Sequence, residues 1–314
     1  MDLSLLVVVL HYRGIADTRE CLASLGRQSY DKLHVLVIDN GSAEPLDEAF
    51  AAEFPWAEVL RLPENNGWAG GNNVGIRLGL TRGDDMVCLL NNDTVLPDHA
   101  VHRLMATAAR LDRFILHPAI DSMGADEPAQ LDPLVPAPLG LQAHSVPDQP
   151  GVFEILAING ACLIAPLDLF REIGLIDERF FLLCEDADIG QRAAAAGYRT
   201  FCDTLVHIRH KESLSFGGRR SPIKTYYGIR NILLFQRKHL TGLRLPLTML
   251  RRFLWTVWAT AEAVGQPPRS WWRLVLWTLS DDRFARAVRM GARDYLRGRF
   301  GRLDRHDEAR LAPK

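Results

Sequence analysis

The sequence has few of the features that mark specialised classes of protein. Its 314 residues include five cysteines, an odd number, and no CxxC pair occurs. Widely spaced cysteines without such pairs argue against a disulfide framework and a structural zinc site. We therefore expect buried thiols in a protein of a reducing cytoplasm, at Cys21, Cys88, Cys162, Cys184 and Cys202.

Long apolar runs and a strong net charge are also missing. No uncharged apolar stretch reaches the roughly 18 residues that a membrane-spanning helix needs. Arginines and a glutamate interrupt the best candidate, residues 243–263. The first 14 residues are apolar but have no basic segment and no small-residue cleavage site, unlike a secretory signal. The net charge is −1, and we expect no nucleic-acid partner.

The charge is unevenly distributed along the chain. Residues 240–314 hold 15 basic and 7 acidic residues, so the acidic surplus lies in the rest of the chain. The same segment contains Trp255, Trp258, Trp271, Trp272 and Trp277. Basic helices with aromatic anchors are typical of surfaces that lie on anionic membranes. A solvated face, a helical cap on the main domain and a dimer contact remain alternatives.

What is present is an alternation of strand and helix patterns. Short aliphatic runs of strand length occupy residues 5–10, 34–38, 58–62 and 86–90, and helical spacing occupies residues 18–28, 46–53, 72–80 and 100–111. This alternation predicts an α/β fold with a mostly parallel sheet flanked by helices. Ligands of such sheets bind outside the carboxyl ends of the strands.

The second half of the chain is less regular. Residues 121–153 are rich in proline and have no clear period, so we expect a long surface loop there. Helical patterns return near residues 166–173 and 187–196, and the tail is helical from about residue 243. We predict a main domain over residues 1–240 and a C-terminal helical appendage over residues 241–314.

Two polar segments follow predicted strands. Asp39 ends the second strand, where a carboxylate can accept a hydrogen bond from the imide N–H of a uracil or thymine ring; an ordinary Asp-Asn-Gly-Ser turn is the alternative. Residues 65–73 (NNGWAGGNN) follow the third strand. Glycines there let the backbone approach a ligand, and the following helix offers N–H groups to an anion. A glycine turn that caps the helix is the alternative.

Asn91, Asn92 and Asp93 end the fourth strand. An aspartate at this place can hold a divalent cation whose other ligands are diphosphate oxygens, since magnesium uses few protein carboxylates. Two aspartates commonly flank one residue in such motifs, and here Asn91 occupies the first position. The site therefore needs a further ligand, which His210 could supply. An Asx-turn explains the same residues without a metal.

Three acids, Glu185, Asp186 and Asp188, follow an apolar run and open a helix. The helix dipole favours acids at this position, and Asp188 forms an i,i+4 pair with Arg192, so a structural role is open. Crowded carboxylates beside apolar residues also have raised pKa values, which suits a general base.

The order and spacing of these segments resemble the family 2 glycosyltransferases, especially their bacterial rhamnosyltransferase-like branch. The matching segments run from residue 4 to about 240: VVVLHYRG, LVIDNGS, NNGWAGGNNVGI, LLNNDT, ING-ACLI, GLIDERFFLLCEDADIGQRAAAAGYR, HKESLS and YYGIRN. The resemblance implies a GT-A-type fold, Rossmann-like, with residues 1–240 as the catalytic domain. His11-Tyr12-Arg13, Asn91 and the proline-rich loop depart from the family pattern.

The resemblance also implies roles for individual residues. Asp186 would be the catalytic base, supported by Glu185, and Asp93 and His210 would bind a magnesium or manganese ion. Asp39 would contact the pyrimidine base. The remaining residues expected to bind the donor are Asn40, Gly67, Gly70, Gly71, Asn72, Asn92 and Arg230.

The implied activity is inverting transfer of a sugar from a nucleotide-diphosphate donor, with dTDP-rhamnose or a UDP-sugar favoured. The acceptor would be a hydroxyl of a glycan or lipid-linked molecule in cell-surface polysaccharide synthesis. We expect a cytoplasmic protein, with peripheral contact of the tail at the inner face of the membrane as one interpretation. A polyprenyl-phosphate glycosyltransferase of the same fold and a catalytically silent nucleotide-sugar-binding protein are the alternatives.

Overall fold

The structure is a computed structural model that describes residues 3–122, 149–156, 158–211, 221–240, 245–266 and 270–311. Residues 123–148, which form most of the predicted proline-rich loop, lie outside the described residues. So do residues 212–220, which contain most of the HKESLS segment, and residues 241–244 at the predicted domain boundary.

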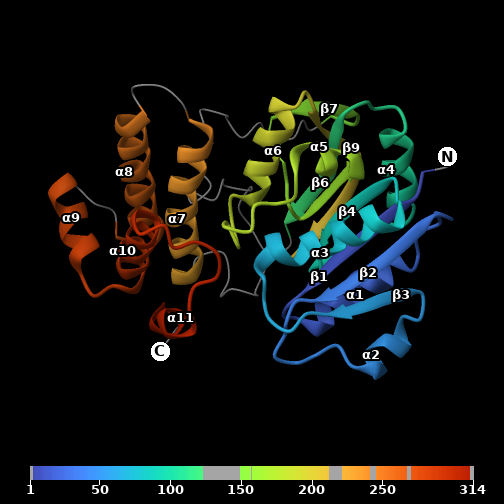
Figure 1. Ribbon diagram of the computed structural model, residues 1–314, viewed down its shortest axis with the longest axis horizontal. Coiled ribbons are helices and arrows are strands. Elements are labelled where there is room, and N and C mark those ends of the chain that lie inside the picture. The colour runs from blue at the N-terminus through green and yellow to red at the C-terminus, as the bar shows by residue number, and fades with distance from the viewer. Residues whose placement is uncertain are drawn as a thin grey trace.

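Strands and helices alternate through the first two thirds of the chain (Figure 1). The strands are β1 (Leu5–His11), β2 (Leu33–Asp39), β3 (Ala57–Arg61), β4 (Met86–Asn91), β5 (Thr94–Val95), β6 (Phe114–Ser122), β7 (Val152–Ile155), β8 (Cys162–Pro166) and β9 (Arg199–His210). The helices are α1 (Ile15–Leu25), α2 (Glu48–Glu53), α3 (Gly67–Arg82), α4 (Ala100–Ala108), α5 (Leu167–Ile173), α6 (Glu185–Ala195), α7 (Pro222–His239), α8 (Leu245–Ala263), α9 (Trp271–Leu279), α10 (Arg283–Leu296) and α11 (Arg305–Leu311).

One sheet carries the main domain, in the order β3-β2-β1-β4-β8-β6-β9-β5, with β7 also paired to β9. The four strands β3, β2, β1 and β4 are all parallel, as the strand–helix alternation predicted. β8 is antiparallel to both β4 and β6, and β9 runs parallel to β6. The sheet is therefore mixed, and its parallel half brings the ends of β1, β2 and β4 to one edge.

The aliphatic runs form strands because their alternate side chains are buried on opposite faces of the sheet. Val7 and Val9 of β1 belong to a core that α1, α2 and α4 cover. Leu6 and Val8 belong to the core on the other face, which α3, α5 and α6 cover. All five cysteines are free and buried, as expected.

The C-terminal helices pack beside the sheet, and α7 lies between it and helices α8 and α10 (Figure 1). Phe181 and Tyr227 stack with ring centroids 5.2 Å apart, so α7 is in contact with the segment that precedes α6. In the part of the chain that the structure describes, no helix is both long enough and apolar enough to cross a membrane.

Several elements differ from the sequence prediction. α3 begins at Gly67 and not at Asn72, so the glycine-rich segment forms its first turns. β6 and β9 were not predicted; β6 contains His117 and Pro118, and β9 contains charged residues among its apolar ones. Both strands are held by pairing with each other, a contact between distant parts of the chain.

Candidate active site

Polar residues end the parallel strands at one edge of the sheet. His11 at the end of β1 is in register with Asp39 of β2, and Leu10 is in register with Asn91 of β4. Parallel strands have their carboxyl ends on the same side, so side chains distant in sequence meet there. Burial lowers the pKa of His11, although the Asp39 carboxylate acts to raise it.

Asp39 is fully buried, and its two oxygens hold the following turn. Oδ1 accepts a hydrogen bond from the Ser42 N–H (2.9 Å), and Oδ2 accepts one from the Leu46 N–H (3.2 Å). The Arg61 guanidinium is 3.5 Å from Oδ2. Contact of Asp39 with a pyrimidine base stays a prediction.

Asn40 braces the loop that precedes α3. Its amide donates to Asn65 Oδ1 (3.1 Å) and to the Gly67 carbonyl (3.0 Å), and its Oδ1 accepts from the Asn66 N–H (3.0 Å). Gly67 N–H bonds to Asn65 Oδ1 (2.8 Å), and Trp68 N–H bonds to the Phe181 carbonyl (2.8 Å). The N–H groups of Asn66, Gly67 and Trp68 are therefore already bonded within the protein.

The glycines of this segment allow close packing of α3. A Cβ on Gly67, whose φ is +72°, would lie 2.2 Å from the Phe181 carbonyl oxygen. A Cβ on Gly71 would lie 2.4 Å from Leu10 Cδ1 of β1. A Cβ on Gly70 would lie 2.8 Å from Asn66 Cβ. We conclude that Gly67 and Gly71 set the approach of α3 to the sheet and to the segment before α6; donor contact by these residues stays a prediction.

Asp93 and His210 lie together, as the sequence predicted. Asp93 Oδ1 is 3.1 Å from His210 Nε2, and both side chains are largely buried. Strand pairing brings them together, because Thr94 of β5 is in register with His210 of β9, and Lys211 N–H bonds to the Asp93 carbonyl (3.0 Å).

The pair fits the ligand set of a divalent cation that takes its remaining ligands from a diphosphate and water. Adjacent ligands of an octahedral ion such as magnesium lie about 3 Å apart. The described residues contain no group of three or more His, Cys, Asp and Glu side chains arranged for a metal. Protein ligands would therefore be Asp93 and neutral His210, whose Nε2 binds a metal only when it carries no proton.

Asn91, which stands where an acid was possible, links this pair to Trp68. Its Nδ2 is 3.4 Å from His210 Nε2, and its Oδ1 accepts a hydrogen bond from the Trp68 indole N–H (3.0 Å). The Trp68 ring also approaches Gly160, where a Cβ would lie 3.6 Å from the indole and 3.5 Å from Asp186 Oδ2. Trp68 therefore lies near both the Asp93–His210 pair and Asp186.

Glu185 and Asp186 are the first two residues of α6, and both have raised pKa values. Burial, followed by the charge of Asp186, raises the pKa of Glu185 to about 8. Burial also raises the pKa of Asp186, although the N–H groups of Ala187 and Gly160 act to lower it. Glu185 Oε2 is buried without a hydrogen-bond partner among the described residues. A carboxylate with a raised pKa is a stronger base once it has lost its proton.

Asp188 has a different role from its two neighbours. It is fully buried and is bonded to Arg192 (2.8 Å), Lys238 (2.7 Å) and His239 (2.7 Å). The contact with Arg192 is the predicted i,i+4 pair. Asp188 therefore joins α6 to α7, and this one of the three acids has a structural role.

The backbone before α6 is strained. Phe181, Leu183 and Cys184 all have positive φ angles (63°, 70° and 72°) although none is glycine. Such conformations persist when the surroundings impose them, at a cost of about 1–3 kcal/mol each. The Asn231 amide nitrogen of α7 lies 2.7–2.8 Å from the carbonyl oxygens of Phe180, Leu182 and Leu183, so its two hydrogens are shared among them.

Arg230 completes this support, and its predicted role in donor binding stays a prediction. Its guanidinium is almost completely buried and donates to the carbonyls of Arg179 (3.0 Å), Phe180 (2.9 Å) and Gly301 (2.6 Å). Its Nε also donates to Asn231 Oδ1 (2.9 Å), so the guanidinium is bonded within the protein. We name Arg230 and Asn231 the α7 clamp, because together they hold the segment that carries Glu185 and Asp186.

Two further predicted donor-binding residues are also bonded within the protein. Asn92 donates to the Arg13 carbonyl (2.9 Å) and to Thr18 Oγ1 (2.8 Å), and it thereby braces the end of β1. Asn72 donates to the Trp68 carbonyl (3.0 Å), while its Oδ1 is buried without a partner in the described part of the chain. Their contact with a donor stays a prediction.

This geometry agrees with what sequence comparison shows. The model of the family Glycosyl transferase family 2 matches residues 6–133. The chain therefore carries a family 2 glycosyltransferase domain, which confirms the resemblance seen in its motifs. The matched region contains Asp39, the glycine-rich start of α3 and Asp93, and it ends before Asp186.

Two relatives are named as rhamnosyltransferases. The chain is 27% identical over 236 residues to N-acetylglucosaminyl-diphospho-decaprenol L-rhamnosyltransferase of Mycobacterium tuberculosis, a match that covers 67% of this chain and 77% of the relative. It is 21% identical to dTDP-rhamnosyl transferase RfbF of Shigella flexneri, covering 77% of this chain and 82% of that protein.

Solved structures confirm the GT-A-type fold. The mannosyltransferase PcManGT of Pyrobaculum calidifontis, solved with GDP-Man and Mn²⁺, superposes with a TM-score of 0.57 at 15% identity and covers 93% of this chain and 86% of its own. GalNAc-T7, solved with UDP, GalNAc and Mn²⁺, has the same TM-score and identity over 80% of this chain. The chain spans 54% of the length of GalNAc-T7.

Proposed function

We propose that this glycosyltransferase is a metal-dependent, inverting enzyme that transfers a sugar from a nucleotide-diphosphate donor to an acceptor hydroxyl. The observation that carries the proposal is that the Asp93–His210 pair and Asp186 both lie near Trp68, the pair through Asn91 and Asp186 through Gly160. The pair suits a cation and a leaving diphosphate, and Asp186 suits removal of a proton.

Asp186 performs the proton transfer in this proposal. Its carboxylate accepts the proton of the attacking hydroxyl while the sugar loses its diphosphate from the opposite face, so that one displacement inverts the anomeric centre. Glu185 is protonated at neutral pH, because its raised pKa is about 8. A neutral Glu185 leaves Asp186 as the charged member of the pair and can donate a hydrogen bond to the acceptor.

Asp93 and His210 would hold the magnesium or manganese ion. When bound, the ion supplies a Lewis acid that offsets the charge growing on the leaving diphosphate. The Asn91 amide lies beside His210 Nε2, and the Trp68 indole N–H holds Asn91 in place. The Mn²⁺ bound in GalNAc-T7 and in PcManGT supports this assignment.

The names of the two relatives support dTDP-rhamnose as the donor and a polyprenyl-diphosphate-linked glycan as the acceptor. UDP-sugars are the second choice, because structures of the same fold hold UDP. An acceptor of this kind places the reaction in cell-surface polysaccharide synthesis at the cytoplasmic face of the membrane.

Donor binding and product analysis test the proposal. We expect dTDP-rhamnose, among UDP-, GDP- and dTDP-sugars, to raise the melting temperature of the full chain most, and more with Mn²⁺ than with EDTA. The product on a lipid-diphosphate-linked N-acetylglucosamine acceptor should have an inverted anomeric centre. A retained anomeric configuration would refute the assignment of Asp186, and transfer only to polyprenyl phosphate would favour the alternative acceptor.

A further inference from the structure

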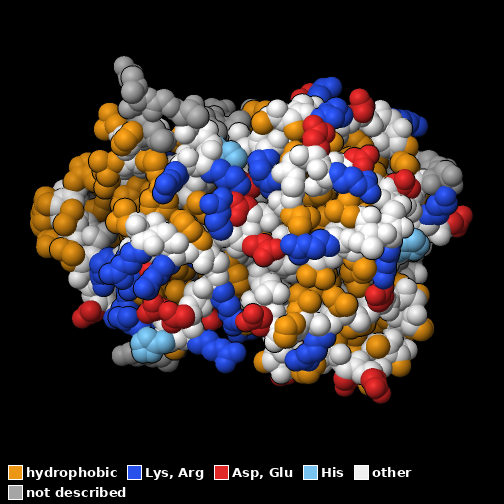
Figure 2. Space-filling view, viewed as in Figure 1, with side chains coloured by type: hydrophobic (Ala, Val, Ile, Leu, Met, Phe, Trp, Pro, Cys, Tyr) orange, Lys and Arg blue, Asp and Glu red, His pale blue; other side chains and the backbone are white. Residues whose placement is uncertain are grey.

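The outer side of the C-terminal helices exposes large apolar side chains. Figure 2 shows hydrophobic side chains gathered on the left of the molecule, where Figure 1 places α8 and α9. Each of the following residues is between 52% and 69% exposed: Leu247, Leu250, Trp255, Trp271, Trp272, Val275, Leu276 and Leu279. We call these residues the α8–α9 face.

This face is continuous across both helices. The rings of Trp258 in α8 and Trp271 in α9 meet edge to face with centroids 4.9 Å apart. Leu274 of α9 is buried and faces the interior, so the exposed residues of this helix do not take part in its packing against the other helices. Contiguous apolar patches of this kind mark interaction sites on protein surfaces.

Uncompensated positive charges accompany the face. Arg251 of α8 and Arg273 of α9 are exposed, and the Arg273 guanidinium lies over the Trp272 ring at 5.2 Å. Arg251, Arg252 and Arg273 form no ion pair with any residue in the described ranges. Arg252 has a buried Nη1 without a hydrogen-bond partner in the same part of the chain.

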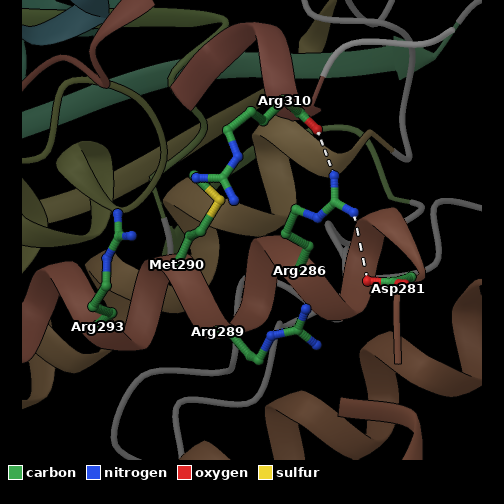
Figure 3. A pocket seen from close by; sticks show the side chains of 6 residues that line it. All are labelled: Asp281, Arg286, Arg289, Met290, Arg293 and Arg310. Atoms are coloured by element: carbon green, nitrogen blue, oxygen red, sulfur yellow. Dashed lines mark hydrogen bonds and ion pairs between the residues drawn. The ribbon is translucent and has the colours of Figure 1, made fainter. Parts of the chain in front are cut away.

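A second basic cluster adjoins α9. Four arginines and Asp281 surround a cavity of about 430 Å³ along α10 (Figure 3), and the arginines are Arg286, Arg289, Arg293 and Arg310. Arg289 donates to the Thr278 carbonyl and, at 2.8 Å, to the Ser280 carbonyl, which places the cluster at the end of α9. Figure 2 shows basic side chains directly beside the apolar ones there.

We propose that the α8–α9 face binds the surface of a lipid bilayer that contains anionic lipids. Tryptophans and leucines enter the interface between headgroups and acyl chains, while arginines contact the anionic headgroups. A symmetric contact between two copies is disfavoured, because it would bring the unpaired arginines of both copies together. The inference extends the proposed function, since a lipid-linked acceptor would lie in the same membrane.

Vesicle flotation of the full chain tests this surface without any substrate, so its result is independent of the proposed transferase activity. We compare vesicles of phosphatidylcholine alone with vesicles that also contain about 30% phosphatidylglycerol, which is an anionic lipid. The variant Leu276→Glu changes the centre of the face. Its matched control is Leu205→Glu, at a leucine of β9 that is 47% exposed and distant from the tail.

We expect the parent chain and Leu205→Glu to float with the anionic vesicles and Leu276→Glu to bind them at least about tenfold more weakly. Arg273→Gln should weaken this binding about fivefold and leave binding to phosphatidylcholine unchanged, whereas the α5 control Arg171→Gln should change neither. Equal binding by Leu276→Glu and Leu205→Glu, or no flotation of the parent chain, would overturn the proposal. A parent dimer that only Leu276→Glu dissociates, without vesicle binding, would assign the face to a second copy.

Discussion

The two halves of the candidate site are held in place by different means. Asp93 and His210 lie beside paired strands, and backbone hydrogen bonds between β5 and β9 fix their separation. Asp186 begins a helix after three non-glycine residues with positive φ, and side chains of α7 hold that segment. The first half depends on the sheet, whereas the second depends on the C-terminal helices.

Because of this difference, the half of the site that contains Asp186 is more sensitive to distant substitutions. A strand end keeps its position as long as its sheet is intact, because each residue is paired. A strained segment keeps its conformation only while its surroundings supply the compensating contacts. We therefore expect substitutions in α7 to disturb Asp186 and to leave the Asp93–His210 pair unchanged.

The largest effect should come from Asp186→Asn. Loss of the base should lower kcat by about 10³-fold, within the range measured for general bases, with an unchanged Kd for the donor. Steady-state kinetics and donor titration measure the two quantities. Asp168→Asn, at an exposed position of α5, is the control and should retain full activity. Near-normal turnover of Asp186→Asn would exclude it as the base.

Asn231→Ala tests the α7 clamp directly. Release of the three carbonyls should misplace Asp186 and lower kcat by about 10²-fold, since small displacements of a catalytic group have effects of this size. Metal-dependent donor binding should change little, because Asn231 does not touch the other half of the site. A parallel loss of donor binding would show that the two halves are not held separately.

Gln236→Leu is the matched control for this prediction. Gln236 is a fully buried amide on the same helix, and within the described residues its side chain has no hydrogen-bond partner. Replacing an unbonded buried amide with an apolar side chain of similar size should be neutral or stabilising. Thermal unfolding of both variants would separate a local effect on kcat from a general loss of stability.

His210→Ala tests the other half of the site. Removal of one of two protein ligands should weaken the apparent affinity for Mn²⁺ by at least about 10-fold, while Asp186 keeps its position and its raised pKa. Titration of donor binding with Mn²⁺ measures the change. His207→Ala, at an exposed histidine of the same strand, is the control. The metal assignment would fail if both variants had the parent affinity.

The smallest effect should be a change in the pH dependence of stability. The pKa of Glu185 is about 8 in the folded chain because of burial and the Asp186 charge. The folded state therefore binds more protons than the unfolded state between about pH 4.5 and pH 8, and the free energy of unfolding falls as pH rises through this window.

Glu185→Gln should remove this dependence and raise the free energy of unfolding at pH 8.5 by on the order of 2 kcal/mol. At pH 4, where Glu185 is protonated, the variant and the parent should differ little. Urea unfolding at several pH values measures both. Glu172→Gln, at a surface glutamate paired with Arg113, is the control and should keep the parent slope. An unchanged slope for Glu185→Gln would contradict the raised pKa.

Much of the site could be predicted because its residues end regular elements. Asp93 follows a strand and Asp186 opens a helix, and their local patterns identify both positions. Trp68 and Gly160 were missed as site residues, although both lie in the segments that resemble the family. Their importance depends on hydrogen bonds to Asn91 and proximity to Asp186, which join strands and helices far apart in the chain.

Arg230 shows the limit of such a prediction. An arginine in a motif suggests an anionic ligand, but this guanidinium donates to the backbone carbonyls of residues 179, 180 and 301 and to the Asn231 side chain. No local pattern identifies acceptors that lie about 50 and 70 residues away, because a guanidinium binds carbonyls and phosphates with the same N–H groups. β6 and β9 were not predicted for the same reason, because their pairing joins distant parts of the chain.

The parallel half of the sheet, the family resemblance and the candidate residues Asp93, His210 and Asp186 could be inferred from the sequence, because period, turn chemistry and residue type act over a few neighbouring residues. The tertiary structure was needed to show that Asn91 and Trp68 connect the two halves and that Arg230 supports the segment before α6. It also decided which apolar residues of α8 and α9 remain exposed, because burial and hydrogen-bond partners are set by what packs against each side chain.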